Sequence, residues 1–87
     1  MTNDELADKV EAYNRTVNNG RGTEVLRQAV THLRRGNHED ARFKCTLDSD
    51  KLTQYEGCLT FLADCDLLSP SMTEYVRNYE KKYGEKK

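Results

Sequence analysis

The sequence has 87 residues, which is enough for one domain and too few for two. Its 14 basic and 15 acidic residues give a formal net charge of −1, so overall charge attracts neither DNA nor an anionic lipid surface. No apolar run approaches the ~18 residues that a membrane-spanning helix needs. We expect a single domain over residues 1–84, with residues 85–87 as a frayed tail.

The first predicted helix begins near Asp4 and ends near Asn18. Thr2 and Glu5 have the spacing of a capping box, in which each side chain accepts a hydrogen bond from the other residue's backbone. Its apolar residues recur every three or four positions and form one stripe: Leu6, Val10, Tyr13 and Val17. The Asn and Gly residues at 18–22 end the pattern, because both tolerate positive φ angles.

A second helix is predicted to begin at Thr23 and to end near Arg35. Thr23 is a suitable N-cap, and Gly36 suits the position just after the helix end. The apolar face consists of Leu26, Ala29, Val30 and Leu33. Asn37 is then a fresh N-cap for the element that follows.

The turn after this helix, at residues 36–41, carries a family resemblance. Together with Ala29 and Leu33 in the preceding helix, it resembles the turn between the two helices of a tetratricopeptide repeat. The resemblance covers about 25 residues, and the sequence holds no second copy of it. It implies a helical hairpin at this point of the chain.

Residues 41–47 fit two periodicities. Phe43, Cys45 and Leu47 alternate with polar residues, which is typical of a strand. A strand needs a partner for its backbone, and no second alternating segment is present in the sequence. We therefore expect a short helix here. A strand paired with its own copy in a homodimer is the alternative.

The fourth helix is predicted to begin at Asp50, with Ser49 as its N-cap, and to end near Cys65. Its apolar residues cover most of the circumference, which is typical of a central helix: Leu52, Tyr55, Cys58, Leu59, Phe61, Leu62, Ala63 and Cys65. Gly57 inside this helix costs about 1 kcal/mol relative to Ala. We therefore expect a neighbouring helix to approach closely at Gly57.

Ser69 and Pro70 begin the last predicted helix, with Pro in the first helical position. One face of this helix carries Met72, Tyr75, Val76, Tyr79 and Tyr83. Tyr and Met are frequent at interfaces, so the stripe either binds a partner or packs on the fourth helix. The elements together predict an all-α fold, a compact bundle of four to five short helices.

Cys45, Cys58 and Cys65 lie among apolar residues and do not form the dense framework of a secreted domain. We expect buried, reduced thiols and a cytoplasmic protein, with a disulfide-linked homodimer as the alternative. His38 and the three cysteines could supply four metal ligands, but their spacing lacks the C-x2-C pairs of structural zinc sites. We predict no metal and no cofactor.

Catalytic motifs are absent from the sequence. It has no Gly-rich phosphate loop and no H-E-x-x-H pattern, and nothing places His32 or His38 beside a cysteine nucleophile. The turn at residues 48–50 resembles part of a calcium loop, but Thr53 and Leu59 stand where that loop needs Gly and Glu. We predict that the protein is not an enzyme.

Charge is segregated along the chain. Residues 15–44 contain seven basic and three acidic residues, a net charge of +4, and all but one of the basic residues are arginines. Such a block binds an acidic protein or a phosphate backbone, or it pairs with the protein's own acidic helices.

The predicted function is therefore binding to another protein, with an acidic surface as one candidate partner, as a regulator, adaptor or phage-type inhibitor. The residues expected to contact the partner are Arg27, Arg34, Arg35, Arg42, Tyr75, Tyr79 and Tyr83. The alternative is nucleic-acid binding through the basic block at residues 15–44, which the near-neutral overall charge makes weaker. We also expect a twofold homodimer with the last helix at or near its interface, and no membrane partner.

Overall fold

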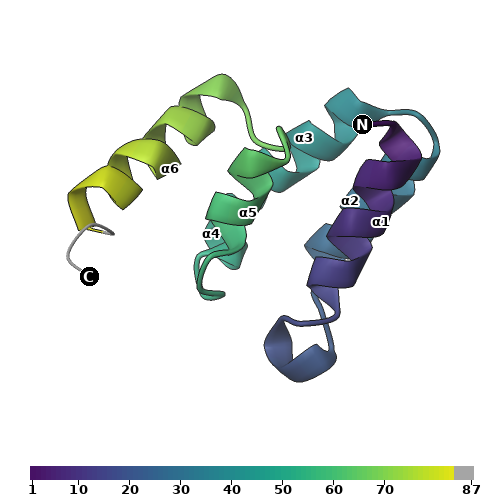
Figure 1. Cartoon of the computed structure of the whole chain (residues 1–87), viewed down its shortest axis with the longest axis horizontal. Coiled ribbons are helices and arrows are strands. Elements are labelled where there is room, and N and C mark those ends of the chain that lie inside the picture. Colours follow the sequence, from purple (N-terminus) through teal and green to yellow (C-terminus); the bar gives the residue numbers. More distant parts are fainter. Residues whose placement is uncertain (84–87) are drawn as a thin grey trace.

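The computed structural model describes residues 1–83 (Figure 1). Over these residues it contains six α-helices, one short 3-10 turn and no strand, so the predicted all-α fold is confirmed. The elements are α1 (Asn3–Asn14), η1 (Asn18–Gly20), α2 (Glu24–Arg34), α3 (His38–Leu47), α4 (Ser49–Leu52), α5 (Cys58–Asp64) and α6 (Pro70–Tyr83). The tail predicted at residues 85–87 lies outside the described residues.

The predicted N-caps of α1 and α2 are confirmed. Glu5 N donates to Thr2 Oγ1 at 3.1 Å and Thr2 N donates to Glu5 Oε1 at 2.8 Å, which completes the capping box. At α2, Leu26 N donates to Thr23 Oγ1 at 3.1 Å. Each bond satisfies a backbone donor that the first turn of a helix leaves without an intrahelical partner.

The first helix ends at Asn14, four residues earlier than predicted. The Asn14 carboxamide is buried, and its Oδ1 accepts a hydrogen bond from Thr23 N at 2.7 Å. Its Nδ2 donates back to Thr23 O at 3.4 Å. These bonds join the end of α1 to the start of α2, so the chain between them closes as a loop instead of a further helical turn.

The helical hairpin implied by the tetratricopeptide-like turn is present, because α2 and α3 pack against each other. Residues 41–47 lie within α3, so the strand alternative is wrong. Ala41 and Cys45, one turn apart, are fully buried. Phe43 and Leu47 are exposed, because a helix that buries one side must present the other to solvent.

The continuous fourth helix was a wrong prediction. The chain forms the short α4, leaves the helix at residues 53–57, and begins α5 at Cys58. Gly57 has a φ angle of +78°, in the left-handed region that a helix does not contain. The predicted close approach at Gly57 is also wrong, since a Cβ there would meet no atom within 4 Å.

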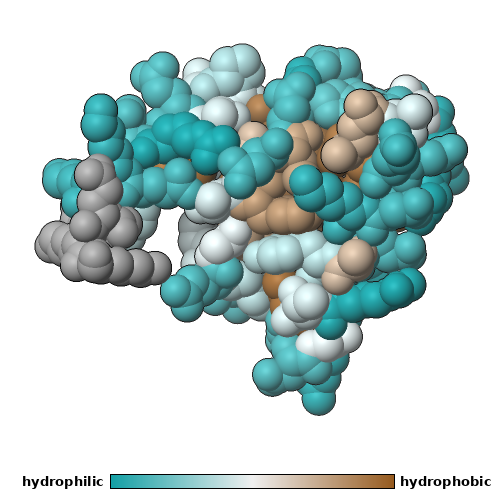
Figure 2. Space-filling model, in the orientation of Figure 1, coloured by the Kyte–Doolittle hydropathy of each residue, from teal (hydrophilic) through white to brown (hydrophobic). Residues whose placement is uncertain are grey.

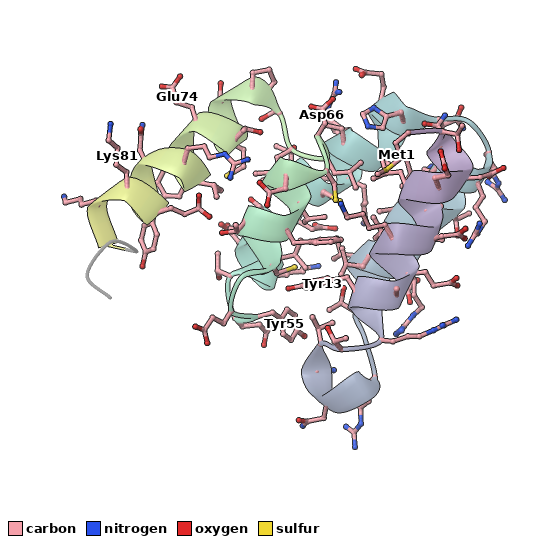
Figure 3. The ribbon with its side chains drawn as sticks, in the orientation of Figure 1. Met1, Tyr13, Tyr55, Asp66, Glu74 and Lys81 are labelled. Carbon is pink, nitrogen blue, oxygen red and sulfur yellow. The ribbon has the colours of Figure 1, made fainter. Side chains whose placement is uncertain are left out.

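The core lies where α1, α2, α3 and α5 meet. Its largest fully buried side chains are Leu26, Leu33, Leu52, Leu62, Leu67 and Leu68. All three cysteines are buried and unbonded to one another, as predicted. The ring of Tyr13 on α1, labelled in Figure 3, stacks on Phe61 of α5 with a centroid distance of 4.1 Å.

The last helix, α6, lies to one side of the other helices (Figure 1). As predicted, Pro70 is its first residue, and Ser69 Oγ caps it by accepting from Met72 N at 3.2 Å. Of the α6 side chains that the structure describes, Val76 alone is buried. The face of α6 seen in Figure 2 is mostly hydrophilic, whereas apolar side chains reach the surface in the middle of the molecule. Within residues 1–83, no helix is long and apolar enough to cross a membrane.

Candidate protein-binding groove

Two of the arginines expected to contact a partner form ion pairs within the chain. Arg34 on α2 donates to Asp8 at 2.9 Å and to Glu11 at 3.1 Å, both on α1. The hydrogen bond to Asp8 raises the pKa of Arg34 above its ordinary value. Arg42 on α3 donates to Asp66 Oδ2 at 2.9 Å, and its side chain is only 23% exposed. Arg34 therefore joins α2 to α1, and Arg42 joins α3 to the turn that follows α5.

Arg27 and Arg35, the other two arginines expected to contact a partner, differ in their side-chain contacts. Arg27 pairs with Glu24 on its own helix at 3.4 Å and donates to the backbone oxygen of Arg21 at 2.9 Å. Arg35 is exposed, and its side chain makes no ion pair or hydrogen bond with the part of the chain that the structure describes. Much of the basic block is thus paired within the chain, in agreement with the alternative that the sequence pattern left open for it.

The tyrosine stripe divides into two parts. Val76 is 4% exposed and Met72 packs against the core, so this part holds α6 in place. Tyr75 and Tyr79 are 61% and 55% exposed, and their ring centroids lie 6.5 Å apart. The side chain of Tyr83 lies outside the described part of the chain. The packed side chains and the exposed side chains of the stripe therefore lie on different edges of α6.

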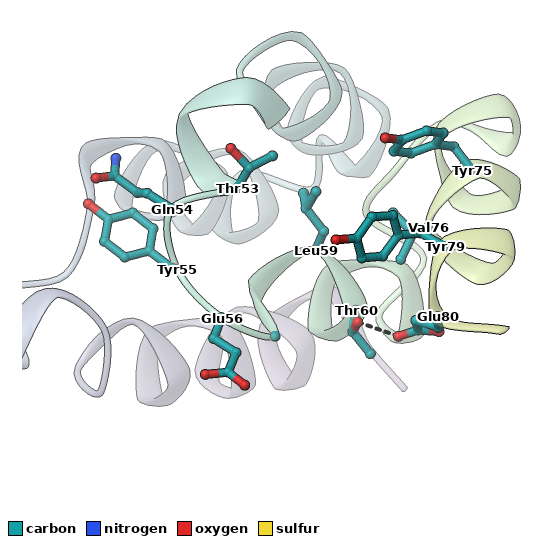
Figure 4. A pocket seen from close by; sticks show the side chains of 11 residues that line it. Thr53, Gln54, Tyr55, Glu56, Leu59, Thr60, Tyr75, Val76, Tyr79 and Glu80 are labelled. Atoms are coloured by element: carbon teal, nitrogen blue, oxygen red, sulfur yellow. Dashed lines mark hydrogen bonds between the residues drawn. The ribbon is translucent and has the colours of Figure 1, made fainter. Parts of the chain in front are cut away.

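The exposed tyrosines line a groove between α6 and residues 53–60, with a volume of about 450 Å³ (Figure 4). Tyr75 and Tyr79 project into it from α6, and Leu59 faces them from α5 (Figure 4). Glu56 and Glu80 are the charged lining residues, and no Arg or Lys of residues 1–83 joins them. The arrangement is an apolar groove with an acidic rim.

Polar contacts fix α6 to α5, and two of the residues that make them, Thr60 and Glu80, also line the groove. Arg77 donates to Asp64 Oδ1 at 2.6 Å, and this bond raises the pKa of Arg77 above its ordinary value. Glu80 accepts a hydrogen bond from the Thr60 hydroxyl and a second one from Arg77 at 3.4 Å. These contacts hold α6 beside α5, while Tyr75 and Tyr79 stay exposed.

Sequence reasoning found Tyr75 and Tyr79 but missed the other side of the groove. The prediction of a continuous helix over residues 50–65 includes both Leu59 and Glu56, with Leu59 on its apolar face. The available signal was Gly57, which follows Tyr55 and Glu56 and is the residue that leaves the helical region. Read as a helix end, Gly57 would have indicated the opening beside α6.

The cysteines are not arranged for nucleophilic chemistry. Burial raises the pKa of Cys45 to about 12 and that of Cys58 to about 11, and burial also raises the pKa of Cys65. The thiolate is the reactive form, so these thiols are inert at neutral pH. Among residues 1–83, no group of three or more His, Cys, Asp or Glu residues is placed to hold a metal ion.

The fold and the groove define a small all-α protein with one open, tyrosine-lined surface on its last helix. Comparison of the chain with protein-family models, with curated proteins and with solved structures finds no match. Function is therefore inferred from the groove and its chemistry.

Proposed function

We propose that this protein is not an enzyme and acts by binding another protein in the groove between α6 and residues 53–60. The observation that carries the proposal is the exposure of Tyr75 and Tyr79 above an apolar groove floor. Tyrosine is frequent among the residues that dominate binding energy, because it offers a large contact area with few rotatable bonds. A regulator, an adaptor or an inhibitor would each use such a surface.

The chemistry of the groove suits an amphipathic helix. A bound helix places apolar side chains at positions i and i+4 into a groove of this kind. Glu56, which is exposed on the rim without an ion pair to any residue in 1–83, favours a partner with Lys or Arg beside those anchors, whereas Glu80 already pairs with Arg77. This differs from the acidic partner proposed on the sequence, since Arg34 and Arg42 are already neutralised by carboxylates of the same chain.

The alternative proposal, nucleic-acid binding, loses support for the same reason. Phosphate contacts need arginines whose charge is available, and Arg34 and Arg42 each already pair with two carboxylates. The three buried thiols support a reducing compartment, and we propose a cytoplasmic location on that basis.

Affinity capture with groove variants tests the proposed function. We expect the wild-type protein to retain a partner from extracts of its source, and the double substitution Tyr75→Ala and Tyr79→Ala to lower the retained amount at least tenfold. Truncating an interface tyrosine removes about 2 kcal/mol or more of binding energy when it is a central contact. Mass spectrometry of the retained proteins gives the readout.

The matched control carries Glu74→Ala and Asn78→Ala, two exposed residues of α6 that do not line the groove. It should retain the partner as the wild type does. Equal retention by the wild type and the tyrosine variant, with both folded by circular dichroism, would contradict the proposal.

A further inference from the structure

The outer side of α3 carries an apolar ridge formed by Phe43 and Leu47. Both side chains are among the most exposed large hydrophobic residues in the described chain, at 66% and 64%. They lie one helical turn apart and therefore side by side on the helix surface. Ala41 and Cys45, on the opposite side of α3, are fully buried. Packing of α3 within the chain thus leaves the ridge uncovered.

The spacing of Phe43 and Leu47 on α3 suits binding in an apolar groove. Anchors at positions i and i+4 of a helix are the pattern that an apolar groove accepts. Lys51 lies eight residues beyond Phe43, and it is exposed without an ion pair to any residue in 1–83. Glu56, on the groove rim, is exposed and is likewise without an ion pair within the described chain. One chain thus carries an apolar ridge followed by a basic residue, and an apolar groove with an acidic residue on its rim. The two features complement each other in polarity and charge.

We propose that the α3 ridge of a second copy of this chain fills the groove, in a reciprocal twofold dimer. Lys51 of each copy then lies against the partner's Glu56. This proposal rests on the proposed function only in using the same groove, and it names the second copy as the occupant.

The placement of the two features favours a reciprocal arrangement. The ridge is on α3, α4 follows it after one residue, and residues 53–57 lead from α4 to the groove. A twofold axis near residues 51–56 would place each ridge across the other groove. It would also bring Lys51 of each copy close to Glu56 of the other copy, because both residues would lie near the axis. Closed twofold dimers are the commonest oligomers.

The exposed apolar area of the ridge and the groove is comparable to the area that a stable dimer interface needs. An aromatic side chain offers about 150–250 Å², so the exposed parts of Phe43, Tyr75 and Tyr79 supply on the order of 100 Å² each. Leu47 adds a similar contribution on the ridge. A stable interface buries about 800 Å² per subunit, and these four side chains provide roughly half of that from apolar surface alone.

Sedimentation velocity over about 10 μM to 1 mM, the range of weak to moderate dimers, tests the proposal. We expect the wild type to reach twice the mass of the chain. The substitution Phe43→Glu should weaken the dimer at least ~100-fold, because it removes an anchor from both halves of a reciprocal interface. The matched control Ala12→Glu, which places the same charge on an exposed position of α1, should leave the dimer unchanged.

A charge exchange then tests the pairing itself. Lys51→Glu and Glu56→Lys should each weaken the homodimer roughly tenfold, because like charges then face each other in both halves. An equimolar mixture of the two variants should recover the wild-type dissociation constant, since both pairs in the mixed dimer are again opposite. Both residues are exposed, so neither variant threatens the fold.

A monomeric wild type at 1 mM, a dimer insensitive to Phe43→Glu, or a mixture that does not recover would each overturn the dimer. A monomer that still shows groove-dependent capture of another protein would leave the proposed function standing. If the wild type forms the dimer but captures no other protein, binding of another protein in the groove is overturned and the dimer stands.

Discussion

Raising the pH from 8 to 11 is expected to unfold the protein through its buried thiols. Burial raises the pKa of Cys45 to about 12 and that of Cys58 to about 11, whereas a thiol in an unfolded chain has a pKa of about 8.5. The folded state therefore retains protons that the unfolded state loses. Stability is full below pH ~8.5 and falls as the pH rises toward the folded-state pKa values.

Each such thiol lowers the free energy of unfolding by about 1.4 kcal/mol per pH unit in this window. Ionisation of Cys45 and Cys58 together lowers the free energy of unfolding by on the order of 5 kcal/mol by pH 11. This loss is comparable to the whole stability of a small domain. Urea unfolding followed by circular dichroism at pH 7, 9, 10 and 11 gives the free energies. We expect the steepest decline between pH 9 and pH 11.

Cys45→Ala is the control, because it removes one of the two titrating thiols with the largest shifts. The variant is less stable at pH 7, since it leaves a small cavity in the core. Its stability should nevertheless decline with pH about half as steeply as that of the wild type. Parallel declines in the two proteins would show that the buried Cys45 thiol does not cause the alkaline unfolding.

Gly22→Ala is expected to destabilise the protein by about 3 kcal/mol. Gly22 has a φ angle of +73°, where an L side chain costs roughly 1–2 kcal/mol. A Cβ at this position would lie 2.6 Å from Nδ2 of Asn14. Asn14 cannot move aside without loss, because its buried carboxamide is bonded to both backbone groups of Thr23. The clash adds a further 1–3 kcal/mol, roughly, as overpacking does.

Gly36→Ala is the matched control for this substitution. Gly36 has a similar φ angle of +80°, and a Cβ there would meet no atom within 4 Å. It should therefore cost only the conformational part, about 1–2 kcal/mol. Urea midpoints of the two variants and the wild type separate the contributions. Equal losses at Gly22 and Gly36 would mean that contact with Asn14 has no role in joining α1 to α2.

The parts of the fold that could be predicted are those fixed by nearby residues. The capping box of Thr2 and Glu5, the Thr23 cap and the proline at the start of α6 involve residues within three positions of each other. The break at residues 53–57 could not be predicted in this way. Both flanking segments are rich in apolar residues, and only the tertiary structure shows that Leu52 and Leu62 enter the core from separate helices.

The long-range ion pairs and the groove both depend on tertiary contacts that the sequence does not show. Arg34 pairs with Asp8, 26 residues away, and Arg42 with Asp66, 24 residues away. The local charge pattern does not reveal either pair. Likewise, the periodicity of α6 places Val76 and Tyr75 on one stripe. It does not say which edge of that stripe packs on α5 and which borders an opening.

Site-specific photo-crosslinking tests most directly whether the groove is a protein contact surface. A benzophenone amino acid placed at Tyr79 points into the groove, and the same group at Glu74 stands on an exposed part of α6 outside it. Irradiation in the native extract should yield a discrete protein adduct from position 79 and none from position 74. An adduct of twice the chain mass would identify the second copy, and a larger one another protein. No adduct from position 79, or equal adducts from both positions, would contradict a binding role for the groove.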